Sequence, residues 1–185
     1  MQTTTTGNAH LSAASGVNWR LVAAALVFVG GLATIAGAWG FELIGEYMPC
    51  KLCLEERIPY YVGVPIAFGA LVAVMVGADR TARILLVATA AVFLWSLYLG
   101  VRHAGIEWNW WTGPDDCGAV SAPSTRDAGG LLGQLQEIHI ARCTEASWRF
   151  PNTGWGLSFA GWNAVISAGI VAVALAGAAW RGKRA

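Results

Sequence analysis

The chain has 185 residues, of which 56% are hydrophobic and only 12% are charged, and its formal net charge is +1. This composition is too apolar for an ordinary soluble domain, and the length excludes an assembly of several domains. The near-neutral charge, without a long basic patch, excludes nucleic acid as an expected partner. The composition therefore predicts a single membrane domain.

Four apolar stretches, taken in chain order, contain no Asp, Glu, Lys or Arg. They cover residues 21–40, 58–78, 84–101 and 157–180. Each is close to the roughly 20 residues with which a helix crosses about 30 Å of hydrocarbon. None shows the two-residue alternation of a barrel strand, and a helix satisfies its own backbone hydrogen bonds in lipid. The sequence predicts an all-α membrane protein, a four-transmembrane-helix bundle that forms one domain over residues 20–185.

The polar segment before the first span, residues 1–19, is rich in Thr, Ser, Ala and Gly, and we expect it to be a disordered tail. The apolar run that follows is longer than the roughly 7 to 15 residues of a signal peptide. We therefore expect this run to be retained as the first membrane span.

Basic residues near the span ends predict the orientation in the membrane. Six of them lie close to the spans on the side that carries both termini: Arg20, Arg80, Arg83, Arg181, Lys183 and Arg184. The basic residues of the opposite side are spread over the longer loops 41–57 and 102–156. The positive-inside rule predicts that both termini are cytoplasmic and that these two loops face the periplasm or an equivalent exterior.

All four cysteines fall in the two predicted periplasmic loops, where disulfides form and persist. Cys50 and Cys53 form a CxxC pair shortly before the second span. Such a pair can close into a disulfide, and its thiol pKa falls near a helix N-terminus or a cation. If a helix starts at Cys50, Arg57 lies four residues after Cys53 on the same face. The CxxC pair is therefore a candidate redox centre.

The second pair, Cys117 and Cys143, is separated by the 25 residues 118–142. This wide spacing argues against a four-cysteine zinc site, so we expect no metal. Two interpretations of the pair remain: a static disulfide that staples the loop, or a disulfide that exchanges with the CxxC pair. The presence of two cysteine pairs on one side of the membrane favours exchange.

The long loop also contains an amphipathic segment, residues 130–142. Four apolar side chains recur there at helical spacing: Leu131, Leu132, Leu135 and Ile138. We expect a short helix that lies in the membrane interface and holds the loop close to the bilayer.

Three features together carry a resemblance to a known family. They are the motif Pro49-Cys-Lys-Leu-Cys-Leu-Glu-Glu-Arg57, the interval between Cys117 and Cys143, and Cys143-Thr-Glu145 followed by Trp148. With the four spans, they resemble the DsbB family of bacterial inner-membrane enzymes over roughly residues 20 to 180. Members of that family reoxidise the periplasmic thiol oxidase DsbA at the expense of quinone.

The resemblance implies a role for each cysteine pair. Cys50 and Cys53 resemble the pair that passes electrons to quinone, either ubiquinone or menaquinone, and Arg57 resembles the arginine beside the quinone ring. Cys117 and Cys143 resemble the pair that accepts electrons from a DsbA-like oxidase. The implied partners are that oxidase, the membrane lipid and its quinone pool.

His103, at the exterior end of the third span, is a further candidate for quinone binding or proton movement. The alternative for His103 and Arg57 is that each is an interfacial polar residue without a catalytic role. Two other functions remain for the whole chain. One is a vitamin K epoxide reductase-like enzyme, and the other is a membrane scaffold or metal-binding protein with structural disulfides.

Overall fold

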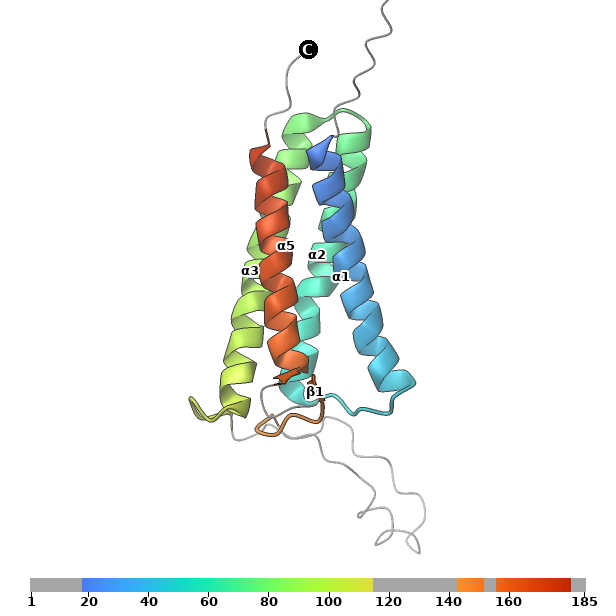
Figure 1. Cartoon of the computed structure of the whole chain (residues 1–185). Helices are drawn as coiled ribbons and strands as arrows, with labels where there is room; N and C mark the ends of the chain where they lie inside the picture. The colour runs from blue at the N-terminus through green and yellow to red at the C-terminus, as the bar shows by residue number, and fades with distance from the viewer. Residues whose placement is uncertain (1–17, 115–142, 152–155, 181–185) are drawn as a thin grey trace, which may run out of the picture.

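Four long helices form the fold in the computed structural model, which describes residues 18–114, 143–151 and 156–180. The helices are α1 (Trp19–Leu43), α2 (Lys51–Met75), α3 (Asp79–Glu107) and α5 (Phe159–Ala179). All four are long and apolar enough to cross a membrane, and they run side by side as a bundle (Figure 1). The predicted four-helix membrane fold is therefore confirmed. The expected tail, as far as residue 17, and the expected interfacial helix lie outside the described residues.

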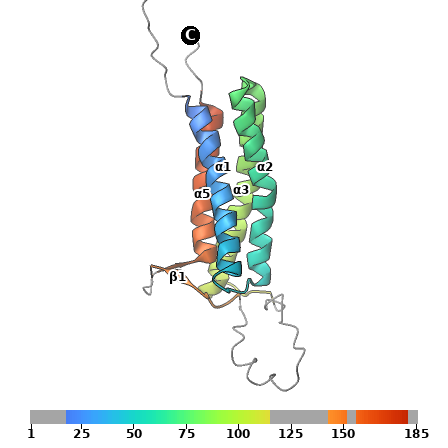
Figure 2. The ribbon, with the colours of Figure 1, turned by 90° about the vertical axis from the view of Figure 1, so that its right-hand side faces the viewer.

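A small antiparallel sheet closes one end of the bundle. Strands β1 (Arg149–Phe150) and β2 (Leu157–Ser158) pair Arg149 with Ser158 and Phe150 with Leu157. Figures 1 and 2 show this sheet at one end, and the start of α1 and the end of α5 at the other. Because the first helix starts and the last helix ends at the same end of the bundle, the arrangement agrees with an even number of membrane crossings.

Two helices extend well beyond the charge-free stretches that predicted them. Helix α2 begins at Lys51 rather than near Ile58, because the Cys50 side chain caps it by accepting a hydrogen bond from the Cys53 backbone N–H. Helix α3 continues past Val101 to Glu107. Both extensions lie at the cysteine end, so they place charged residues of the loops on rigid helices.

Arg20 joins three helices at the end opposite the cysteines. Its side chain is only 3% exposed and forms an ion pair with Asp79 at the start of α3. It also donates to the Trp180 carbonyl oxygen at 2.6 Å and to the Gly177 carbonyl oxygen at 3.4 Å, both at the end of α5. These contacts satisfy the guanidinium in a buried position and tie α1, α3 and α5 together.

Small residues allow α3 and α5 to pack closely. A Cβ added to Gly100 of α3 would lie 2.9 Å from the Ala164 backbone nitrogen and 3.2 Å from the Ala160 carbonyl oxygen of α5. These are backbone atoms, so they cannot move away without displacing the helix. Close approach of this kind lets helices gain dispersion contacts in lipid, where no hydrophobic force drives them together.

We expect Gly100→Ala to destabilise the bundle by about 1–3 kcal/mol, because the added methyl group overpacks the contact between α3 and α5. Gly30→Ala is the matched control, since its added Cβ meets nothing within 4 Å. Thermal unfolding of both variants in the same detergent measures the difference. Equal stability of the two variants would contradict the close packing at Gly100.

Candidate functional site

The CxxC pair lies at the N-terminus of α2. Cys50 is the N-cap residue and is 2% exposed, whereas Cys53 lies in the first turn and is partly buried. Both are free thiols, and their sulfur atoms are 2.9 Å apart. The helix N-terminus directs unpaired backbone N–H groups toward Cys50, an arrangement that favours a thiolate there.

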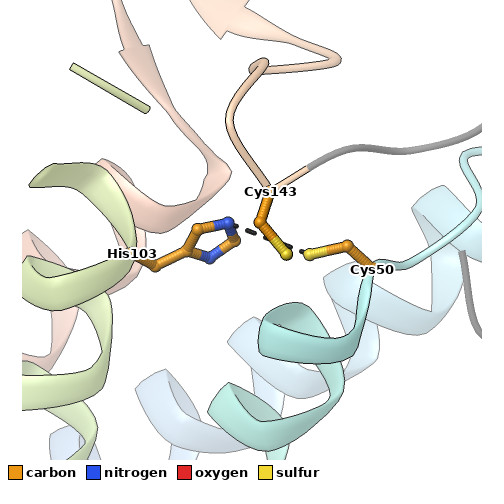
Figure 3. A group of neighbouring side chains, drawn as sticks. All are labelled: Cys50, His103 and Cys143. Atoms are coloured by element: carbon orange, nitrogen blue, oxygen red, sulfur yellow. Dashed lines mark hydrogen bonds between the residues drawn. The ribbon is translucent and has the colours of Figure 1, made fainter. Parts of the chain in front are cut away.

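Cys143 lies directly against this pair. It is buried and disulfide-bonded, and it packs with Cys50, Leu52 and Ile106 in one cluster. The sulfur atoms of Cys50 and Cys143 and a ring nitrogen of His103 all lie within 4.8 Å of one another. Figure 3 shows the two sulfur atoms pointing at each other. The fourth cysteine of the predicted site, Cys117, lies outside the described residues.

This cluster brings a free thiol to a disulfide. A similar spacing of sulfur and nitrogen atoms is found around metal ions, but a sulfur atom in a disulfide carries no thiolate charge for a metal. A thiolate next to a disulfide sulfur is instead the arrangement for exchange through a mixed disulfide. In the redox state described here, the cluster is suited to exchange chemistry.

His103 connects Cys50 to a buried carboxylate. Its Nε2 atom is 3.8 Å from the Cys50 sulfur, and its Nδ1 atom is 2.8 Å from Glu56 Oε1. The second carboxylate oxygen of Glu56 accepts a hydrogen bond from Asn163 Nδ2 at 3.0 Å, and the Tyr60 hydroxyl donates to Asn163 Oδ1 at 2.7 Å. The network thus joins α2, α3 and α5 beneath the cysteines.

The Cys50 thiol is strongly acidified by its neighbours. A hydrogen bond from the Cys53 thiol and the interaction with His103 together lower the pKa of Cys50 from 9.0 to about 4, against the opposing effect of burial. The thiolate is therefore the form of Cys50 present at neutral pH while the CxxC pair is reduced. Since the thiolate is the reactive species in exchange, Cys50 is prepared for that chemistry.

A cavity of about 350 Å³ opens beside the CxxC pair, between α1, α2 and α5. Its polar lining includes both thiols of the CxxC pair, Glu56, Arg57, His103 and Glu107. Aromatic side chains form part of the remaining wall: Phe41, Tyr47, Trp148, Phe159 and Trp162. The rings of Trp148 and Phe159 stack with centroids 4.7 Å apart. An apolar, aromatic cavity with a few polar groups is typical of a site for a flat organic molecule.

Arg57 is held at the edge of this cavity by α1. Its guanidinium forms an ion pair with Glu42 and donates to the Ala38 carbonyl oxygen at 3.4 Å. It also lies 5.2 Å from the centre of the Trp39 ring, within the range of a cation–π contact. These contacts fix the position of a permanent positive charge beside Cys53 and the aromatic wall.

A family model described as "Disulfide bond formation protein DsbB" matches residues 20–177, which is most of the chain. The chain belongs to the DsbB family. The DsbB-family protein is accordingly a multi-pass membrane protein of disulfide bond formation, with the four apolar helices expected of it. No curated protein and no solved structure matched the chain.

Five of the six predicted site residues come together at one end of the bundle: Cys50, Cys53, Arg57, His103 and Cys143. Sequence reasoning missed Glu56 and Asn163. Glu56 was assigned to a loop, where a glutamate needs no explanation. Once α2 begins at Lys51, Glu56 becomes a buried acid within an apolar helix, which is a signal of function. Asn163, a polar residue inside the last apolar stretch, carried the same signal.

We expect alkylation of Cys50 in the fully reduced protein to keep a nearly constant rate between about pH 8 and pH 6. A thiol with a pKa near 8.5 would slow by about tenfold per pH unit over that range. The rate stays constant because the pKa of Cys50 is lowered, so the reactive thiolate is lost only as the pH falls through about 4. Mass spectrometry after timed iodoacetamide treatment measures Cys50 separately. A tenfold fall in the alkylation rate of Cys50 per pH unit would contradict the lowered pKa.

Proposed function

We propose that this DsbB-family protein reoxidises a DsbA-like periplasmic thiol oxidase and passes the electrons through its two cysteine pairs to quinone. The observation that carries the proposal is the free Cys50 sulfur facing the disulfide-bonded Cys143 within 4.8 Å, beside an aromatic cavity. A static scaffold has no need for a reactive thiol placed against a disulfide. A relay requires that contact.

The relay begins at the loop pair, Cys117 and Cys143. A thiolate of the reduced oxidase attacks the disulfide of this pair, which forms a mixed disulfide with Cys117 and releases Cys143 as a thiolate. Cys143 then attacks Cys50 in the disulfide between Cys50 and Cys53. Further exchange releases the oxidised partner, restores the loop disulfide and leaves Cys50 and Cys53 reduced. Each step exchanges one S–S bond for another, so no electrons are lost.

The residues around the cavity fit a quinone ring. The aromatic wall offers flat apolar contacts, and Arg57 offers N–H donors that can bind a quinone oxygen and stabilise negative charge on it. Bound quinone supplies the acceptor for two electrons. Cys53 lines the cavity, so the thiols that lose electrons lie next to this acceptor.

We also propose that the cysteine end faces the periplasm and that both termini are cytoplasmic. The start of α1 and the end of α5 lie at one end of the bundle, and the start of α2, which Cys50 caps, lies at the other (Figure 1). Arg20, Arg80 and Arg83 are at the end that carries the termini, as the positive-inside rule requires of a cytoplasmic side. Disulfide chemistry then occurs in an oxidising compartment.

Purified protein should reduce ubiquinone or menaquinone when a reduced DsbA-like oxidase supplies electrons. We expect Cys50→Ser and Cys53→Ser to abolish this turnover, because each removes a sulfur atom from the electron path. Cys117→Ser should also block turnover with the oxidase but leave the CxxC pair able to form its disulfide with quinone. The loss of quinone absorbance measures the turnover of the wild type and of the three variants.

Full turnover by Cys117→Ser would contradict the order of the relay. The competing scaffold function predicts one stable disulfide state, so it is excluded if a mixed disulfide with the oxidase is trapped. A vitamin K epoxide reductase-like activity would appear as epoxide reduction that needs no thiol oxidase.

Arg57→Ala should raise the KM for quinone by about 10- to 100-fold, the usual effect of losing a hydrogen bond from a charged donor. Arg102→Ala is the matched control, because Arg102 is a cation at the same end of the bundle but is not among the residues that line the cavity. Steady-state kinetics with a water-soluble quinone measures KM. An unchanged KM in Arg57→Ala would count against this role of Arg57.

A further inference from the structure

We propose that Glu56 carries the proton released by Cys50 from His103 to the quinone in the cavity. This inference rests on the proposed function and deepens it, because it assigns the route of a proton that quinone reduction requires. The argument comes from the placement of Glu56, which contacts His103 on one side and lines the cavity on the other.

The two ring nitrogens of His103 face different partners. Nε2 lies 3.8 Å from the Cys50 sulfur, and Nδ1 lies 2.8 Å from Glu56 Oε1. An imidazole in this position accepts a proton at one nitrogen and releases one from the other. The ring therefore connects the thiol to the carboxylate although Cys50 and Glu56 do not share a hydrogen bond.

Asn163 and Tyr60 hold the carboxylate in place. Asn163 donates from Nδ2 to Glu56 Oε2 at 3.0 Å, and its Oδ1 accepts from the Tyr60 hydroxyl at 2.7 Å. The Tyr60 donor fixes which way the Asn163 amide points, so an N–H rather than an oxygen faces Glu56. These two hydrogen bonds keep Glu56 Oε1 directed at His103, the position in which it can accept a proton from the ring.

The burial of Glu56 also calls for a function. The residue is 8% exposed and lies in a helix that is apolar enough to cross the membrane. An ionised carboxylate is costly in such a place, and acids within membrane helices commonly serve proton relays. Stability alone would favour an apolar side chain at this position.

The proposed step balances in atoms and electrons. The Cys50 thiolate and the Cys53 thiol lose two electrons and one S–H bond and form one S–S bond, while the quinone gains two electrons and two O–H bonds. His103 holds at Nε2 the proton that Cys50 gave up when its thiolate formed, a proton leaves Nδ1 for Glu56, and Glu56 delivers it to one quinone oxygen. The Cys53 thiol, which lines the cavity together with Cys50 and His103, supplies the second proton.

Glu107 is the other carboxylate near His103. Its nearest oxygen is 3.9 Å from Nε2, the nitrogen that faces Cys50, and its Oε2 atom has no hydrogen-bond partner among the described residues. That distance is too long for a hydrogen bond. Both carboxylates line the cavity, but only Glu56 lies within hydrogen-bond distance of His103, so the geometry favours Glu56.

The test uses Glu56→Gln, whose amide oxygen can still accept from Nδ1 but cannot carry a proton. In the full-length protein, we expect single-turnover reduction of a water-soluble quinone to slow by about 100-fold, the range for loss of a general acid–base group. Disulfide exchange between the oxidase and the cysteines should stay within about twofold of wild type. The reaction in D₂O should show a larger isotope effect in the variant.

Glu55→Gln is the matched control, since Glu55 is the adjacent glutamate and is not among the residues that line the cavity. Infrared difference spectra on reduction of the thiols should contain a protonated-carboxyl band that Glu56→Gln removes and Glu55→Gln keeps. Added formate should restore part of the rate in Glu56→Ala. A purely structural role of Glu56 would produce neither the band nor the rescue.

Quinone reduction by the wild type distinguishes a failure of the proposed function from a failure of the proton route through Glu56. If wild type reduces quinone and Glu56→Gln does so at the same rate, the proton route through Glu56 is overturned and the proposed function stands. A loss confined to Glu107→Gln would also overturn it. If wild type does not reduce any quinone while it exchanges disulfides, the proposed function itself fails.

Discussion

The hydrogen bond between His103 and Glu56 is the constraint on which the cysteine end of the bundle depends. It joins α3 to α2, and the bond from Asn163 to the same carboxylate adds α5. A buried carboxyl group needs both partners, so any slip of one helix along another would leave a buried polar group without a hydrogen bond. Glu56 thus fixes the register of three helices and also contacts His103, the neighbour of the Cys50 thiol.

The two ends of the bundle differ in how the helices are held together. At the end that carries the termini, the buried side chain of Arg20 binds α3 and α5 to α1. At the cysteine end, α1 is held by the ion pair between Arg57 and Glu42 at the edge of the cavity. One end is therefore closed by a buried charge, and the other keeps a hollow between α1, α2 and α5. The proposed quinone site is the hollow at the cysteine end.

The sequence predicted the four helices because the charge-free runs are the parts of each helix that meet lipid. It did not predict where α2 and α3 begin and end, because Glu56, Arg57 and His103 are charged or polar side chains that find partners inside the bundle. A hydropathy rule assigns such residues to loops. Their pairing depends on contacts between helices distant in sequence, so the network with Asn163 could only be seen once the helices were placed together.

The acidity of Cys50 gives the proposed relay a direction. In a mixed disulfide between Cys50 and Cys143, attack by Cys117 on Cys143 would expel Cys50, and a thiol of low pKa is a good leaving group. The lowered pKa of Cys50 therefore favours regeneration of the loop disulfide and reduction of the CxxC pair. A highly stable thiolate is also a weaker nucleophile, which slows the reverse attack of Cys50 on Cys143. In the proposed relay, electrons that reach Cys50 and Cys53 are thereby retained beside the cavity, from which the proposed quinone removes them.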